Sequence, residues 1–190
     1  MVLWEKQRQL SMTKPMTQKR LYNITLFYLS KYEASSEKVR QMLRRRLEKA
    51  VFNGEEIPVE APQWIENIIQ KMITLHYIDD SRYTENQVRI LSSQGKSENF
   101  IICKLQQSGI SADLTRSFLE KQDESDIDRA VNWLKHHRKG GFRTHFPQTD
   151  EEIRLIYQKD MAALGRAGFS YQTAKEALSQ SQVIFPDANE

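Results

Sequence analysis

The sequence has few of the residues that interrupt helices, and only one residue that could form a disulfide. Its 190 residues include 7 glycines, 5 prolines and 1 cysteine. Glycine and proline mark the frequent tight turns of β proteins, so their scarcity favours long helices. The single cysteine, Cys103, excludes an internal disulfide framework and fits a reducing compartment.

Long apolar runs and a strong net charge are also absent. No apolar stretch approaches the roughly 20 residues that a membrane-spanning helix requires, and residues 1–15 have no continuous apolar core of a signal peptide. We therefore expect a cytoplasmic protein that makes no membrane contact. The net charge is only +3, from 28 basic and 25 acidic residues, which is low for a protein that binds through phosphate contacts alone. The basic residues cluster in a few segments, which suits contact with a charged assembly through particular faces.

What the chain does contain is helical periodicity. Apolar residues recur at three- and four-residue spacing in nine segments, and no segment alternates as a strand does. The inward faces are expected to include Ile153 and Tyr171 in the last two segments. The predicted helices lie near residues 20–32, 36–49, 62–73, 80–94, 98–108, 111–121, 127–139, 150–167 and 170–180.

Two kinds of helix signal stand out. Asp79 and Asp80 offer carboxylate caps to the unpaired N–H groups of the helix that follows them. Gly109 can take the left-handed conformation that ends a helix, and Ile110 and Ser111 then follow as packing residue and next cap. The same ending recurs at Gly168.

This recurrence indicates an internal repeat. Leu105 and Leu164, which precede the two glycine endings, lie 59 residues apart, and a weaker counterpart of the helices lies upstream in residues 28–43. Such a step predicts a helical unit used three times. We expect an all-α fold of three tandem three-helix units, residues 18–76, 77–122 and 123–182, that form an elongated, curved body. A mobile basic tail at 1–17 and a frayed C-terminus at 183–190 would flank them.

Three segments also resemble the RecX family of bacterial regulatory proteins, which modulate the RecA recombinase. They are residues 77–83 (YIDDSRY), residues 95–111 and residues 158–170. The similarity covers roughly residues 20–180, and its order and spacing are more distinctive than any single segment. The family usually has glycine where His76 stands, and a basic residue is common where Ser108 and Ala167 stand.

The resemblance implies a regulator that lies in the helical groove of a RecA–DNA filament. It would inhibit or disassemble the filament, and so lower ATP hydrolysis, strand exchange and repressor cleavage by RecA. Members of the family can act as inhibitor or stimulator. Whether this protein contacts DNA directly stays open, and any interaction with DNA could be indirect or weak. We expect a monomer with no cofactor.

Basic side chains are the candidates for contact with the filament or its DNA. Their alternative role is a solvated helix face, as for the three consecutive arginines near Glu37 and Glu48. The candidates are Arg40, Arg44, Arg45, Arg46, Lys96, Lys104, Lys135, Arg138, Lys139, Arg143, Arg154, Lys159 and Arg166.

Residue patterns typical of catalysis or metal binding are sparse. Adjacent Asp79 and Asp80 are more typical of caps than of a metal site, because no further ligand is near in sequence. His136 and His137 lack the spacing that would set two imidazoles on one helix face, and Cys103 is expected to be a packed, inert thiol. The chain also lacks a glycine-rich phosphate loop. We therefore expect no metal and no enzymatic activity.

The main alternative is an autonomous helical DNA-binding protein, since each predicted unit resembles a helix-turn-helix by its number of helices. That hypothesis predicts tight, steeply salt-dependent DNA binding without RecA, and the small net charge argues against it.

Overall fold

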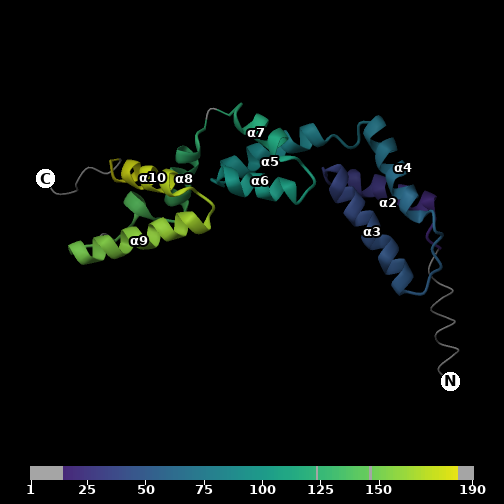
Figure 1. Ribbon diagram of the computed structural model, residues 1–190, viewed down its shortest axis with the longest axis horizontal. Helices are drawn as coiled ribbons and strands as arrows, with labels where there is room; N and C mark the ends of the chain where they lie inside the picture. The colour runs from purple at the N-terminus through teal and green to yellow at the C-terminus, as the bar shows by residue number, and fades with distance from the viewer. Residues whose placement is uncertain (1–14, 123, 146, 184–190) are drawn as a thin grey trace, which may run out of the picture. The chain divides into compact units, whose positions relative to one another are not determined.

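The computed structural model describes residues 15–122, 124–145 and 147–183 (Figure 1). Within these ranges the chain forms nine α-helices, one short 3-10 helix and no strand, which confirms the all-α prediction. The predicted basic tail and frayed C-terminus fall largely on residues 1–14 and 184–190, outside the described ranges. The elements are α2 (Gln18–Leu29), α3 (Ser36–Phe52), α4 (Ala61–Thr74), α5 (Asp80–Ser93), α6 (Glu98–Gln106), α7 (Ala112–Leu119), α8 (Asp126–His136), η1 (Gly140–Phe142), α9 (Asp150–Arg166) and α10 (Tyr171–Val183).

The chain divides into two compact units, residues 1–83 and 84–190. The boundary between them falls within α5. The grouping of the helices into three units of three stays a prediction.

The first unit is built on α2, α3 and α4, which pack against one another. Leu21 of α2, Leu43 of α3 and Met72 of α4 are fully buried, and they share one core with Ile65 and Ile78. On α4 the buried Ile65, Ile68 and Met72 stand three and four positions apart, so this helix turns one apolar stripe inward. The core therefore fixes α3, which carries all four basic candidates of the first unit, beside α4.

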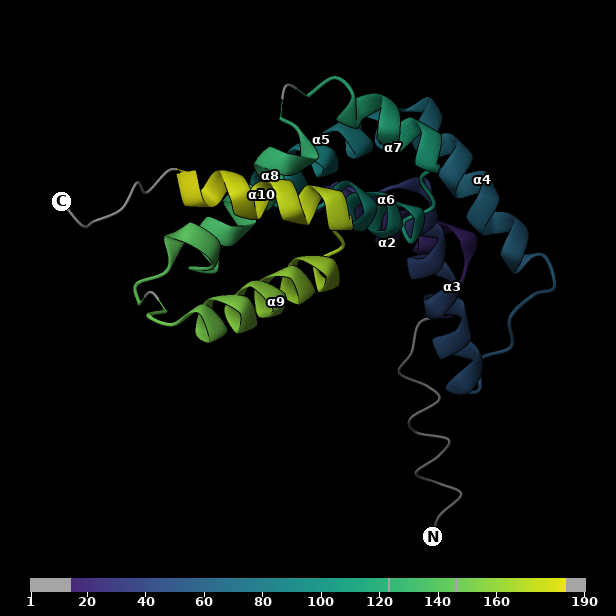
Figure 2. The same cartoon turned by 60° about the vertical axis from the view of Figure 1, so that its left-hand side comes forward.

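The second unit has a core where α8, α9 and α10 meet. Leu134 of α8, Leu164 of α9 and Leu178 of α10 belong to one buried cluster, and Figure 2 shows α10 alongside α8. Gly95 lets α8 approach closely, because a Cβ at Gly95 would lie 3.3 Å from the Arg129 carbonyl oxygen. In the same unit α6 packs on α7.

Six helix ends close with the same hydrogen bond. At each, one residue has a φ between 50° and 92°, and the next residue's N–H donates to the carbonyl five positions earlier. This is the arrangement known as a Schellman ending. Gly109 (φ 78°) and Gly168 (φ 92°) take this role, as their sequence pattern predicts. The other four positions are Gly54, His76, Gly95 and Arg138.

Three predicted packing positions are wrong. Cys103 is exposed, although its neighbour in the chain Ile102 is half-buried and Ile101 is fully buried. Tyr171 is 73% exposed at the first residue of α10, and Ile153 is 47% exposed in the first turn of α9. Both lie in the first turn of a helix, where the side chain projects beyond the core that the rest of the helix contacts.

Candidate interaction surfaces

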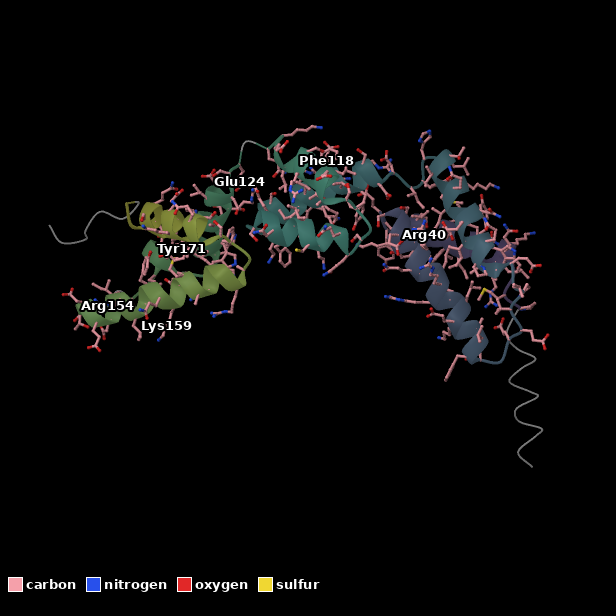
Figure 3. The ribbon with its side chains drawn as sticks, in the orientation of Figure 1. Arg40, Phe118, Glu124, Arg154, Lys159 and Tyr171 are labelled. Carbon is pink, nitrogen blue, oxygen red and sulfur yellow. The ribbon has the colours of Figure 1, made fainter. Side chains whose placement is uncertain are left out.

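Arg40 links α3 to α4. Its Nε donates to Glu66 Oε1 at 2.8 Å, its Nη2 donates to Glu66 Oε2 at 3.0 Å, and its Nη1 donates to Glu37 Oε2 at 2.5 Å (Figure 3). The hydrogen bond from Arg40 holds the pKa of Glu66 below its ordinary value. Burial acts to raise the pKa of Glu37, but hydrogen bonds from Arg40 and Gln41 outweigh it and leave that pKa lowered. Both carboxylates therefore stay ionised at neutral pH, and Arg40 is paired with them inside the protein.

The next three arginines of α3 are free. Arg44, Arg45 and Arg46 are exposed, and none makes a hydrogen bond or ion pair within the part of the chain that the structure describes. Arg44 also lines a groove between α3 and α4. The first unit thus presents three exposed guanidinium groups on α3 that make no hydrogen bond or ion pair with the described residues.

The buried carboxylate of Asp160 pairs with some, but not all, of the basic residues at the end of α8 and in the turn that follows it. Asp160 is 1% exposed, and both its oxygens accept from Arg143 Nη2 at 2.6 Å. Lys139 Nζ approaches Oδ1 at 3.3 Å, and the Gly140 N–H donates to Oδ2 at 2.9 Å. Lys139 and Arg143 are therefore engaged inside the fold, and their charges serve to hold the turn after α8 against α9.

Lys135 and Arg138 lie in the same segment but are exposed, and no described residue pairs with them. Within the described ranges Arg138 is also one of two non-glycine residues with positive φ, at 50°. These two cations remain available to a partner.

The remaining candidates lie on α9 or in and near α6. Arg154 and Lys159 are exposed on α9 (Figure 3), as is Arg166, and none of the three has an ion pair among the described residues. Lys104 of α6 is also exposed, whereas the Lys96 ammonium lies 5.4 Å from the ring centroid of Phe100.

The start of α6 is tied to the end of α9. Ser97 Oγ donates to the Ala167 carbonyl at 3.0 Å, and Asn99 Nδ2 donates to the Gly168 carbonyl at 3.3 Å. A Cβ at Gly168 would lie only 2.6 Å from Ser97 Oγ. The glycine thus serves both the left-handed turn and this close contact.

Sequence reasoning missed Arg129. This side chain is fully buried; its Nη2 donates to Glu98 Oε1 at 2.7 Å, and its Nη1 donates to the Glu124 carbonyl at 2.8 Å. Its Nε also donates to Asp126 Oδ1 at 3.3 Å. Arg129 joins the start of α8 to the start of α6. In the sequence Arg129 is one charged residue beside the apolar face of its helix, and an arginine on the surface would show the same pattern.

The two adjacent aspartates at the start of α5 act on different helices. Asp79 Oδ1 accepts from the Arg82 N–H at 3.0 Å, at the start of α5 itself. The carboxylate of Asp80 reaches back to Ser36 at the start of α3. Neither aspartate lies in a cluster of metal ligands: within the described residues no group of three His, Cys, Asp or Glu side chains could hold an ion.

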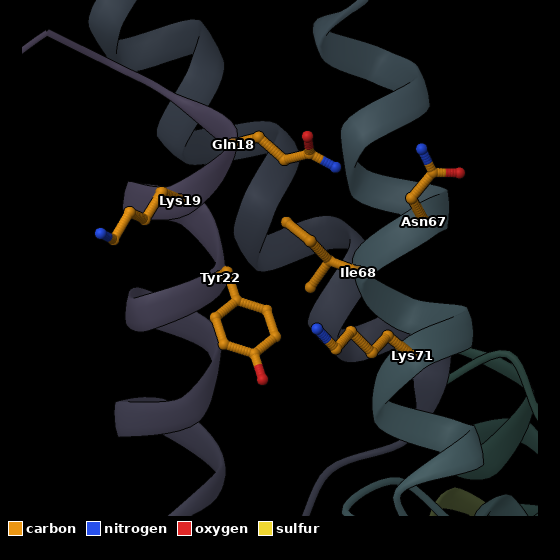
Figure 4. Close-up of a pocket in the computed structure, with 6 residues that line it drawn as sticks. All are labelled: Gln18, Lys19, Tyr22, Asn67, Ile68 and Lys71. Atoms are coloured by element: carbon orange, nitrogen blue, oxygen red, sulfur yellow. The ribbon is translucent and has the colours of Figure 1, made fainter.

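A second groove of the first unit lies between α2 and α4 (Figure 4). Its polar side chains do not converge: the Lys71 ammonium lies 4.8 Å from the ring centroid of Tyr22, and Lys19 points away from the groove. The lining offers no carboxylate, imidazole or thiol that could transfer a proton at neutral pH. It consists of Gln18, Lys19, Tyr22, Asn67, Ile68 and Lys71.

None of the helices in the described ranges is both long enough and apolar enough to cross a membrane.

No family model matches the sequence. A curated relative, the regulatory protein RecX of Myxococcus xanthus (strain DK1622), is 32% identical over 164 residues, which cover 85% of this chain and 85% of the relative. A crystal structure of RecX from Lactobacillus salivarius has a TM-score of 0.64 at 22% identity and covers 87% of this chain and 97% of its own. A crystal structure of another regulatory protein RecX has a TM-score of 0.62 at 22% identity, covering 86% and 71%. The structural likeness supports the all-helical fold, and the sequence identity over most of both proteins shows that this chain belongs to the RecX family of regulatory proteins.

Proposed function

We propose that this protein regulates the RecA recombinase by binding the RecA–DNA filament in its helical groove. The observation that carries the proposal is the 32% identity, over most of the chain, to a protein named as regulatory protein RecX. The basic side chains that the fold leaves unpaired give the proposal a physical basis. Exposed cations that have no ion-pair partner in the described ranges are found on α3 of the first unit and on α9 of the second.

The proposed action is obstruction of the filament. A helical polymer presents the same surface at a fixed step, and a chain of helical units with separated cationic faces can contact successive subunits. Bound there as a monomer, the protein would bridge neighbouring RecA subunits, block extension and favour disassembly. ATP hydrolysis, strand exchange and RecA-assisted repressor cleavage would fall together, and this partner would place the protein in the cytoplasm.

The test is a titration of this protein into RecA that is hydrolysing ATP on single-stranded DNA. We expect the rate to fall at substoichiometric or equimolar protein. An unchanged rate would overturn the proposal, and a rise would overturn inhibition while retaining contact with RecA.

Autonomous DNA binding is the second candidate, favoured by the unpaired Arg44, Arg45 and Arg46 on one helix. It predicts binding to single-stranded DNA without RecA, with an affinity that falls steeply as salt rises because each neutralised phosphate releases counterions. Binding that is weak at physiological salt and becomes tight only when RecA is added would contradict it.

A further inference from the structure

The groove between α3 and α4 combines an apolar floor with one cation, Arg44, that makes no hydrogen bond or ion pair with the residues that the structure describes. Leu47 and Ile65 are buried core residues that reach the groove, and Pro62 contributes a third apolar side chain. Arg44 stands on the α3 wall. The remaining lining residues are Glu48, Gln63 and Glu66.

The positive charge of Arg44 is not neutralised by the carboxylates around it. Glu66 is already occupied by two hydrogen bonds from Arg40, at 2.8 Å and 3.0 Å. Glu48 is four positions after Arg44, a spacing at which ion pairs form on helices, yet no ion pair joins them. The charge of Arg44 is nevertheless felt across the groove, because it contributes to lowering the pKa of Glu66.

Large apolar side chains continue the same face of α3 beyond the groove. Val51 and Phe52 stand seven and eight positions after Arg44, so they lie on its side of the helix. Val51 is 58% exposed and Phe52 is 91% exposed. Val59, in the connection between α3 and α4, is 94% exposed. An arginine on a helix face that also exposes an aromatic and an aliphatic side chain has the composition of a protein–protein contact centre.

We propose that this α3–α4 surface, defined as the groove together with Val51, Phe52 and Val59, binds an acidic segment of a partner protein that also carries an apolar side chain. Arg44 takes the carboxylate of the segment, and its apolar side chain packs between the groove floor and Phe52. A nucleic acid fits the surface less well than a segment with a single carboxylate, because it carries a phosphate at every nucleotide, whereas Arg44 is the one cation among the residues that line the groove and Glu48 and Glu66 border it. The inference rests on the proposed function, since a RecA subunit is then the partner that supplies this segment.

The test measures the binding of fluorescently labelled full-length protein to RecA filaments, assembled on single-stranded DNA with a slowly hydrolysed ATP analogue. The variants are Arg44→Glu, Arg44→Gln and Phe52→Ala. The matched controls lie on α10 of the other unit: Lys175→Glu repeats the charge reversal at an exposed lysine, and Tyr171→Ala removes a ring that is 73% exposed. Thermal unfolding of every variant reports whether it folds as the wild type does.

We expect Arg44→Glu and Phe52→Ala each to weaken filament binding about 10-fold or more, as truncation of a contact-centre residue does, and Arg44→Gln to have an intermediate effect. The two controls should change affinity less than about 2-fold. Wild-type binding with unchanged affinity in both Arg44→Glu and Phe52→Ala would overturn the assignment of this surface but leave the proposed function intact. No filament binding by the wild type would overturn the proposed function itself. An equal loss of affinity for single-stranded DNA alone would show a nucleic-acid surface, and would also overturn the inference.

Discussion

The carboxylate of Asp80, at the first residue of α5, holds the first residue of α3. Its Oδ1 accepts from the Ser36 N–H at 2.7 Å, and its Oδ2 accepts from the Ser36 hydroxyl at 2.6 Å. An anion at this position satisfies an otherwise unpaired N–H and interacts favourably with the positive end of the α3 dipole. One side chain therefore joins helix starts that are 44 residues apart in the chain.

Replacement of Asp80 should destabilise the protein more than replacement of its neighbour. Asp80→Ala removes a charged acceptor of two hydrogen bonds from the half-buried Ser36, and we expect a loss of about 2 kcal/mol in the free energy of unfolding. Asp79→Ala removes one N-terminal cap and should cost about 1 kcal/mol. Urea unfolding followed by circular dichroism measures both. Equal losses would show that the long-range bond adds nothing.

His76 is the position where a glycine should stabilise the fold. Its φ of 57° is unfavourable for a side chain with a Cβ, by about 1–2 kcal/mol, and its imidazole is exposed. Glycine loses about 0.5–1 kcal/mol more in chain entropy, so His76→Gly should give a net gain of roughly 0.5 kcal/mol. Gly109→Ala, at a φ of 78°, should change stability in the opposite direction. Two changes of the same sign in thermal unfolding would contradict this account.

Asp160 should be the most sensitive residue of the second unit. Asp160→Asn leaves Lys139 and Arg143 without their shared, buried counter-charge, and we expect a cost of about 3 kcal/mol. Asp150→Asn, at the exposed first residue of the same helix, is the matched control and should cost under about 1 kcal/mol through the helix dipole. A similar midpoint of denaturation for the two variants would argue against the buried-charge role.

The basic residues near the end of α8 divide into exposed side chains and side chains that contact Asp160, and this division predicts two classes of variant. Lys135→Glu combined with Arg138→Glu should weaken inhibition of RecA and lower stability only by about 1 kcal/mol through the dipole of α8, because both side chains are exposed and unpaired among the described residues. Lys139→Gln combined with Arg143→Gln should lower stability, because both side chains contact Asp160. ATPase inhibition and thermal unfolding, measured side by side, separate the classes. Full inhibitory potency in the first double variant would remove that site from the proposed interface.

Acid should destabilise the first unit by protonating the two glutamates that Arg40 contacts. The pKa values of Glu37 and Glu66 are lowered in the folded protein, so their contribution to stability is present above the ordinary glutamate value of 4.5 and is lost as pH falls through the lower folded values. Solvent screening keeps the effect modest, because Glu66 is 45% exposed. Arg40→Met should therefore flatten the decline of stability between about pH 5 and pH 3. An unchanged decline would mean that other carboxylates carry it.

Helix boundaries were predictable because the signals that set them are local. The Ser97 and Ser111 hydroxyls accept from the N–H groups of Phe100 and Leu114, three residues later, as their positions in the sequence indicate. A pattern of this kind needs no knowledge of the rest of the fold. The same holds for the glycine endings.

Partners of the charged residues could not be predicted in this way. Arg40 is one of four arginines in α3, and only packing of α4 brings Glu66, which is 26 residues away, to its side. Asp160 looks like a surface residue until α9 packs beside the turn that carries Arg143. Cys103 was misplaced for a simpler reason: it is two positions from Ile101, and two helical steps turn a side chain to the opposite face.

The helix-ending hydrogen bonds have a consequence for how the protein is made. Each joins residues five positions apart, and six helix ends of the described chain close in this way. Such a bond can form as soon as its own short segment has left the ribosome, without waiting for a distant partner. The long-range links, such as that from Asp80, then need only dock helices whose limits are already set.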